Sequence, residues 1–144
     1  MPSRYIFDAN IYIQCMQDRK FALRHEAEYT RRIPLTFFCS VVVQELLLGC
    51  THDLAMKRVQ AFYKPFERVN RIISPLYQDW EETGIIGRKI IRKYPSLKTK
   101  RFALINDILI GLCCRRVGAT LVTKNSKDFR IISAIKPIRF EAWE

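Results

Sequence analysis

The sequence has few glycines and histidines and no long hydrophobic run. Glycine occurs 5 times and histidine twice in 144 residues. No apolar stretch approaches the ~20 residues that a membrane-spanning helix requires. The charged residues Arg4 and Asp8 near the start do not fit a secretory signal. We therefore expect a cytoplasmic protein without a membrane span.

The cysteines form no regular framework, and their number is odd. They are Cys15, Cys39, Cys50, Cys113 and Cys114. No Cys-x-x-Cys pair is present, and Cys50 with His52 is too small a set to indicate zinc. We expect reduced, partly buried thiols rather than a disulfide-stabilised fold or a zinc site.

Acidic residues are scarce compared with basic ones. Asp and Glu total 14 against 25 Lys and Arg, which gives a formal net charge of +11. Such a surplus favours a polyanionic partner, most often nucleic acid, although a merely soluble basic protein stays open at this point. A hydrophobic fraction of 49% excludes a disordered chain. The length suits one domain, residues 1–144.

Short β-branched runs alternate with longer helical patterns, which predicts an α/β fold with a mostly parallel sheet of four to five strands. The expected strands are Arg4–Asp8, Leu35–Cys39, Val69–Ile73, Ala119–Thr123 and Ile138–Phe140. The expected helices are Asn10–Gln17, Phe21–Arg32, Val41–Leu48, Asp53–Phe66, Leu76–Tyr94, Asn106–Arg116 and Lys127–Ile132. Ser40 is expected to cap a helix, and Gly49 and Gly118 are expected to end helices.

Four acids lie in unusually apolar surroundings: Asp8, Glu45, Asp107 and Asp128. Burying a carboxylate costs several kcal/mol unless it is paired, hydrogen-bonded or metal-bound. For Asp107 alone, a helix N-terminus is an alternative explanation. Asp8 and Asp128 follow predicted strands, and sites of open α/β sheets form at the carboxyl ends of the strands. We therefore expect the four carboxylates to converge there.

Clustered carboxylates repel one another unless some stay protonated or a cation lies among them. Oxygen ligands alone favour Mg²⁺ or Mn²⁺ over zinc or copper. Hydrolysis of phosphodiesters is the reaction that fits both such a metal and a basic surface.

Four segments, residues 6–10, 43–46, 106–110 and 121–129, resemble the motif regions of PIN domains, most closely those of VapC-type toxins of bacterial toxin–antitoxin pairs. Val122-Thr123-x-Asn125-x-x-Asp128-Phe129 is the most specific of these motifs. The resemblance covers essentially the whole chain. It implies a parallel sheet between two helical layers, metal-dependent endoribonuclease activity, a homodimer and inhibition by a small cognate antitoxin.

The resemblance also implies residue roles. The acids Asp8, Glu45, Asp107 and Asp128 match the metal-binding positions of the family, and we expect Asp8 and Asp107 to bind the metal directly. The polar residues Asn10, Thr123 and Asn125 match its supporting positions. Ala9 departs from the family pattern, in which a hydroxyl residue is frequent. The segment 111–114 replaces a more usual alanine-rich helix, which bears on packing more than on chemistry.

A basic stretch precedes Asp107, and residues 83–106 contain no acid. Our candidate RNA-binding residues are Arg88, Lys89, Arg92, Lys93, Lys98, Lys100 and Arg101, with Lys124 from the last motif. A solvated helix face is the alternative for this stretch. Tyr12, Tyr94 and Phe129 are aromatic candidates for stacking on bases, although core packing explains such residues more often. Leu54, Phe62, Tyr63 and Phe66 are candidates for an amphipathic surface that binds another chain.

Two other functions stay open from the sequence alone. One is a PIN-fold module that binds nucleic acid without cleaving it, although four intact acids argue against it. The other is a phosphoacceptor domain of receiver type, which also carries an acid after its first strand.

Overall fold

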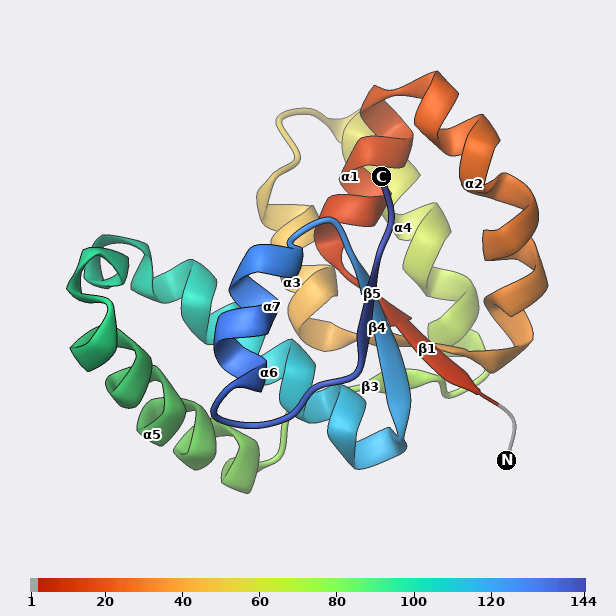
Figure 1. The fold of residues 1–144 in the computed structure, drawn as a ribbon. Coiled ribbons are helices and arrows are strands. Elements are labelled where there is room, and N and C mark those ends of the chain that lie inside the picture. Colours follow the sequence, from red (N-terminus) through yellow and green to blue (C-terminus); the bar gives the residue numbers. More distant parts are fainter. Residues whose placement is uncertain (1–2) are drawn as a thin grey trace.

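In the computed structural model, which describes residues 3–144, five strands form one parallel sheet in the order β3-β2-β1-β4-β5 (Figure 1). The strands are β1 (Arg4–Phe7), β2 (Thr36–Cys39), β3 (Ile72–Ile73), β4 (Ala119–Thr123) and β5 (Phe140–Ala142). The helices are α1 (Ala9–Gln17), α2 (Arg19–Arg32), α3 (Ser40–Leu48), α4 (Asp53–Arg68), α5 (Tyr77–Lys93), α6 (Arg101–Val117) and α7 (Ser126–Ser133). Short 3₁₀ segments, η1 (Ile33–Leu35) and η2 (Pro95–Lys100), complete the chain. The predicted α/β class and parallel sheet are confirmed.

The strand order excludes one of the two alternatives. Receiver domains have the order 2-1-3-4-5, with their first strand between the second and the third. Here β1 lies between β2 and β4 at the centre of the sheet, and Ile6 is in register with both Phe37 and Leu121. The chain is therefore not a phosphoacceptor domain of receiver type.

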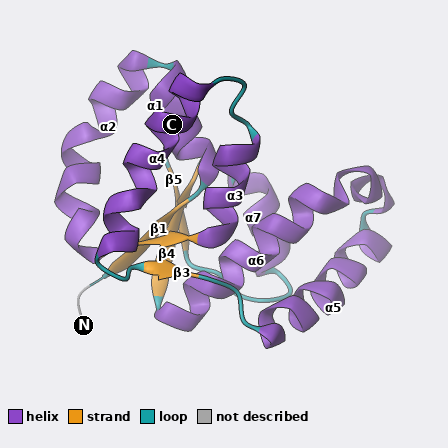
Figure 2. Ribbon diagram, turned by 180° about the vertical axis from the view of Figure 1, so that it is seen from behind, coloured by secondary structure: helices purple, strands orange, loops and turns teal. Residues whose placement is uncertain are grey.

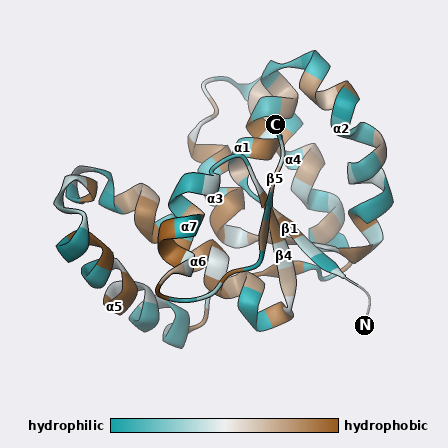
Figure 3. Cartoon of the chain, viewed as in Figure 1, coloured by the Kyte–Doolittle hydropathy of each residue, from teal (hydrophilic) through white to brown (hydrophobic). Residues whose placement is uncertain are grey.

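Helices cover both faces of the sheet (Figure 2). Phe7 of β1 packs edge-to-face on Tyr29 of α2 at 5.0 Å between ring centroids, and Phe38 of β2 lies 6.1 Å from Tyr63 of α4. The other face carries α6, in which residues 108–114 are all buried. A helix that is apolar on every side is expected to be covered on every side, and both α5 and α7 pack against α6. Hydrophilic and hydrophobic residues are mixed along α2 and α5 (Figure 3).

Several predicted boundaries are wrong for identifiable reasons. α2 begins at Arg19 rather than Phe21, because the Asp18 carboxylate accepts hydrogen bonds from the Lys20 and Phe21 amides. Ser40 is not a cap. It is the first helical residue of α3, and Cys39 before it makes no side-chain capping bond. α6 begins at Arg101 rather than at Asn106.

The predicted strand Val69–Ile73 is reduced to β3, because residues 69–71 close the end of α4. Asn70 adopts a left-handed conformation (φ 58°), and the Arg71 amide donates to the Phe66 carbonyl. The last strand begins at Phe140 instead of Ile138. The predicted stops at Gly49 and Gly118 are confirmed, and Gly118 has the left-handed φ of 67° that favours glycine at this position.

Gly111 explains the departure of segment 111–114 from an alanine-rich helix. A Cβ atom at this position would lie 2.7 Å from the Cδ1 atom of Ile138. The absent side chain therefore lets Ile138 seal the core beside α6, just before β5. The five cysteines are all free thiols in the described chain, and Cys39, Cys113 and Cys114 are buried. Among residues 3–144, no helix combines the length and the apolar character needed to cross a membrane.

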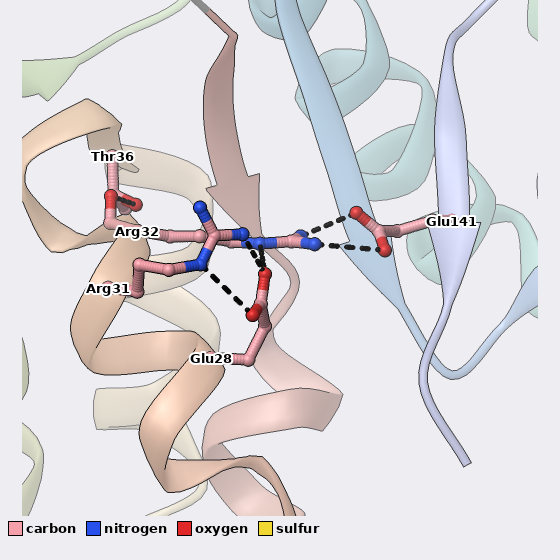
Figure 4. A network of polar contacts seen from close by, with 5 residues as sticks. All are labelled: Glu28, Arg31, Arg32, Thr36 and Glu141. Atoms are coloured by element: carbon pink, nitrogen blue, oxygen red, sulfur yellow. Dashed lines mark hydrogen bonds and ion pairs between the residues drawn. The ribbon is translucent and has the colours of Figure 1, made fainter.

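A buried arginine attaches the edge strand β5 to α2 (Figure 4). The Nη1 and Nη2 atoms of Arg32 donate to both carboxylate oxygens of Glu141, at 2.5 and 3.3 Å. Its Nε donates to Glu28 at 2.7 Å, and its guanidinium lies 4.2 Å from the centroid of the Tyr5 ring. The Arg32 side chain is 11% exposed and the Glu141 side chain 38%, so solvent screens the pair from the Glu141 side only.

We expect Arg32→Ala to lower the free energy of unfolding by about 1–2 kcal/mol, because it removes the partly buried ion pairs with Glu141 and Glu28 and the packing of the guanidinium on the Tyr5 ring. Arg31→Ala is the matched control. Arg31 also pairs with Glu28, but its side chain is 64% exposed, so little change is expected. Urea denaturation of both variants tests this, and equal losses of stability would contradict the role assigned to Arg32.

Candidate active site

The candidate site lies at the carboxyl ends of β1 and β4, the two central neighbours of the sheet. Phe7 and Val122 are in register, so Asp8 and Thr123 come next to each other as the strands end. The Thr123 hydroxyl donates to Asp8 Oδ2 at 2.8 Å. Asp8 is 3% exposed and also caps α1, since its Oδ1 accepts from the Ala9 amide at 2.8 Å. One side chain thus ends β1, begins α1 and faces the site.

Asn10 connects the end of β1 with the end of β4. Its Nδ2 lies 3.2 Å from Asp8 Oδ2 and 3.3 Å from Thr123 Oγ1. Its Oδ1 accepts a hydrogen bond from the Lys124 amide at 3.0 Å. Burial raises the pKa of the Asp8 carboxyl, although the hydrogen bonds from Thr123 and the Ala9 amide act in the opposite direction. These contacts orient the Asp8 carboxylate without neutralising it.

Asn125 joins two further acids that come from different helices. Its Nδ2 donates to Asp128 Oδ2 at 2.8 Å and to Asp107 Oδ2 at 3.3 Å. Its backbone amide donates to Thr123 Oγ1 at 2.9 Å, which links this pair to the Asp8 side of the site. Asp128 is in the first turn of α7. Asp107 is well inside α6, so the helix N-terminus does not explain it.

Glu45 reaches the cluster from α3. Its Oε1 is buried and has no hydrogen-bond partner within the described residues. Burial raises the pKa of Glu45 to about 7, and the charge of Asp8 adds to this effect. The Asn106 side chain acts in the opposite direction through a hydrogen bond. Sequence reasoning missed Asn106, although its place directly before Asp107 in an otherwise apolar segment was a usable signal.

The acids influence one another electrostatically. Burial raises the pKa of Asp107 to about 8, and the charges of Asp8, Glu45 and Asp128 contribute after burial. Hydrogen bonds thus link Asp8, Asp107 and Asp128 through Asn10, Thr123 and Asn125, and Glu45 interacts with Asp8 and Asp107 electrostatically. We call the four acids and these three polar residues the acid cluster.

The donor set of the acid cluster fits a hard divalent cation. Within residues 3–144, no three His, Cys, Asp or Glu side chains already stand at ligand spacing. However, the side-chain atoms available as metal ligands are oxygens. One of them, Glu45 Oε1, is buried and accepts no hydrogen bond within the described residues. Carboxylate oxygens without sulfur or imidazole suit Mg²⁺ or Mn²⁺. A cation would also offset the mutual repulsion that, after burial, adds to the raised pKa of Asp107.

The predicted basic residues are spread over three elements. Arg88, Lys89, Arg92 and Lys93 are exposed on α5, Lys98 and Lys100 on η2, and Arg101 begins α6. Of these, Lys100 lines the same cavity as Asp128, together with Lys127 of α7. Sequence reasoning missed Lys127, although it directly precedes Asp128. Lys124 lies next to the acid cluster through its backbone, while its Nζ lies 4.6 Å from the centroid of the Phe21 ring.

The aromatic candidates divide by burial. Tyr12 and Phe129 are core residues, 2% and 0% exposed, so neither can stack on a base, whereas Tyr94 is 38% exposed. The expected amphipathic surface on α4 is also largely wrong, because Tyr63 and Phe66 are buried under the sheet. Phe62 is half-buried, and Leu54 is exposed.

The chain is an α/β protein with a parallel sheet covered by helices on both faces, and its acids gather at the carboxyl ends of the central strands. Within that class, the chain belongs to the PIN domain family, whose model matches residues 5–134. The predicted family is thereby confirmed. No functionally curated protein matches the chain.

Solved structures agree on the fold. The chain is similar to a chain of VapBC2 from Rickettsia felis bound to a DNA fragment from their promoter, with a TM-score of 0.63, 22% identity, and 97% and 98% of the two chains covered. It is also similar to a chain of DNA-bound VapBC from Salmonella typhimurium, with a TM-score of 0.63, 23% identity, and 99% and 100% covered. VapBC-1 from nontypeable Haemophilus influenzae gives a TM-score of 0.62, 19% identity, and 96% and 97% covered. At such identities these likenesses show a shared fold.

Proposed function

We propose that this protein is a metal-dependent endoribonuclease and acts as the toxin of a toxin–antitoxin pair. The observation that carries the proposal is the convergence of acids from four separate elements at one sheet edge of a chain with a net charge of +11. The amide of Asn125, hydrogen-bonded to both Asp107 and Asp128, supports a cluster built for a ligand, because acids that only needed neutralising would pair with the abundant arginines.

In this proposal Asp8 and Asp107 hold Mg²⁺ or Mn²⁺ directly, and Glu45 and Asp128 complete the site. When bound, such an ion supplies Lewis-acid activation of the phosphodiester and a more acidic water. The chain's own residues orient the acids. Thr123 and Asn10 fix Oδ2 of Asp8, while Asn125 holds the carboxylates of Asp107 and Asp128 near each other.

Binding of RNA is assigned to the basic residues that precede and flank the acids. Exposed lysines and arginines on α5 and η2 neutralise phosphates of a single strand, and they carry no sequence preference in doing so. This part of the proposal rests on charge and exposure. It includes the candidates from Arg88 to Arg101 and Lys124.

We also propose a cognate antitoxin partner, a homodimer, one domain over residues 1–144 and a cytoplasmic location, where RNA substrates are found. The described structure begins at Ser3, so Met1 and Pro2 lie outside it. The candidate binding surface for the antitoxin is an apolar groove lined by Phe62 of α4 together with Ile11 and Leu23. That groove has a volume of about 350 Å³.

The experiment uses purified full-length protein, freed of any bound antitoxin, with total bacterial RNA. Discrete fragments that form with Mg²⁺ or Mn²⁺ and disappear with EDTA are the expected result. Retained RNA binding without cleavage under every metal condition would instead favour the non-catalytic nucleic-acid-binding module.

A further inference from the structure

We propose that a cavity beside the acid cluster binds one nucleotide of the RNA, next to the phosphate that is cleaved. The cavity lies between α7 and the junction of η2 with α6, and its volume is about 330 Å³. We call it the lysine pocket, after Lys100 and Lys127 in its wall. The assignment rests on the proposed function for its choice of polymer, whereas the pocket itself is a feature of the fold.

The lysine pocket has an apolar wall that suits the base of a nucleotide and lysines that suit its phosphate. Leu97, Leu104 and Ile131 provide an aliphatic surface, and Tyr94 adds a partly exposed ring. Flat apolar surfaces and aromatic rings bind the faces of bases without strong sequence preference. A base therefore has a surface on which to stack, and this surface belongs to two segments, residues 94–104 and α7.

Positive charge enters the lysine pocket from both of these segments. Lys100 ends η2 and Lys127 lies in the first turn of α7, and both are exposed. Among residues 3–144, neither lysine takes part in an ion pair, whereas Lys64 and Lys136 do. Two unpaired ammonium groups at one apolar cavity fit a ligand that carries phosphate next to an apolar ring.

The pocket is continuous with the acid cluster through a single side chain. Asp128 lines the cavity, and its Oδ2 also accepts a hydrogen bond from Asn125 Nδ2. The same Nδ2 donates to Asp107. A strand whose base occupies the pocket therefore continues directly over Asp128 to the other acids. This continuity and the charge favour a nucleotide of the substrate over a segment of a partner protein.

The test measures binding in EDTA, so that it does not depend on cleavage. Fluorescence anisotropy of labelled ten-nucleotide oligouridylate and oligoadenylate is compared for the full-length protein and for Lys100→Ala/Lys127→Ala. We expect about tenfold weaker binding and a salt slope, log Kd against log salt, that is smaller by about 1.4, which corresponds to two phosphates of a single strand. The matched control is Lys57→Ala/Arg68→Ala, which removes two exposed charges from α4, on the other face of the sheet.

Tyr94 provides a second, uncharged readout. Tyr94→Leu is expected to weaken binding by about tenfold and Tyr94→Phe to retain it, because stacking needs the ring and not the hydroxyl. Tyr77→Leu, at an exposed tyrosine of α5, is the control. Equal effects of the two double variants overturn the pocket, and full affinity of Tyr94→Leu overturns the stacking surface. Selective loss of binding without any cleavage by the parent protein would retain the pocket and contradict the nuclease.

Discussion

Asp8→Asn is expected to lower the rate of metal-dependent RNA cleavage by about 10²–10³-fold or more, because it removes the most buried negative charge of the acid cluster. Asparagine has the shape of aspartate and still offers one oxygen. It therefore keeps the cap on α1, since Asn and Asp serve almost equally at a helix N-terminus. The fold should survive while affinity for the cation is lost. The measurement is the initial rate of cleavage at saturating Mg²⁺.

Asp18→Asn is the matched control for this prediction. Asp18 caps α2 as Asp8 caps α1, but it lies outside the acid cluster and should leave the rate unchanged. Thr123→Val tests orientation rather than charge, because it removes the 2.8 Å hydrogen bond to Asp8, and a loss of about 10–100-fold is expected. A fully active Asp8→Asn protein would refute the assignment of the site.

Asp107→Asn is expected to make the metal-free protein more stable at pH 8 by roughly 1–3 kcal/mol and to abolish the proposed RNA cleavage. Burial raises the pKa of Asp107 from 3.8 to about 8 in the folded protein, so folding favours the protonated carboxyl. This contribution to stability is fully present below pH 4 and is lost as the pH rises toward 8. Asparagine carries no charge at either pH and can still accept the Asn125 hydrogen bond.

Urea denaturation in EDTA at pH 5 and pH 8 provides the measurement. The parent protein should lose stability between these values, the variant should lose less, and Glu26→Gln on the surface of α2 should behave like the parent. Burial also raises the pKa of Glu45 to about 7 in the parent protein, so part of the slope should remain in Asp107→Asn. Added Mg²⁺ should restore stability to the parent at pH 8 more than to the variant. Identical pH dependence in parent and variant would contradict the buried charge.

The acid cluster could be predicted because each acid interrupts an apolar pattern whose element was recognisable. Asp8 follows the apolar strand β1, and Asp128 follows the turn after β4. The rule that neighbouring parallel strands end at the same edge was enough to predict that these two acids lie close together. Asn106 and Lys127 were missed because each directly precedes an acid, Asp107 or Asp128, that already stood out from its apolar surroundings. The residues near them in space, Glu45 and Lys100, belong to other elements. Polar residues next to a recognised acid deserve the same attention as the acid.

Two further predictions failed because hydrophobic periodicity alone does not show helix closure or packing. The strand at Val69–Ile73 had the right composition, but its first half closes α4 through the left-handed Asn70. Tyr63 and Phe66 read as an exposed amphipathic surface, yet they pack under Phe38 of β2. For residues 69–71 the local closure of α4 decided, through the hydrogen bond from the Arg71 amide to the Phe66 carbonyl. For Tyr63 and Phe66 the packing of α4 against β2 decided which face is buried.

The double duty of Asp8 gives position 8 an unusual profile in a mutational library. Asparagine, serine and threonine can all begin a helix as caps, whereas an apolar residue cannot, so soluble yield should group these three with the parent. Growth inhibition of the host cells by the proposed toxin, in contrast, should occur only with aspartate at position 8. The folded but harmless members of such a library would be the proteins of choice for trapping an intact RNA strand in a crystal.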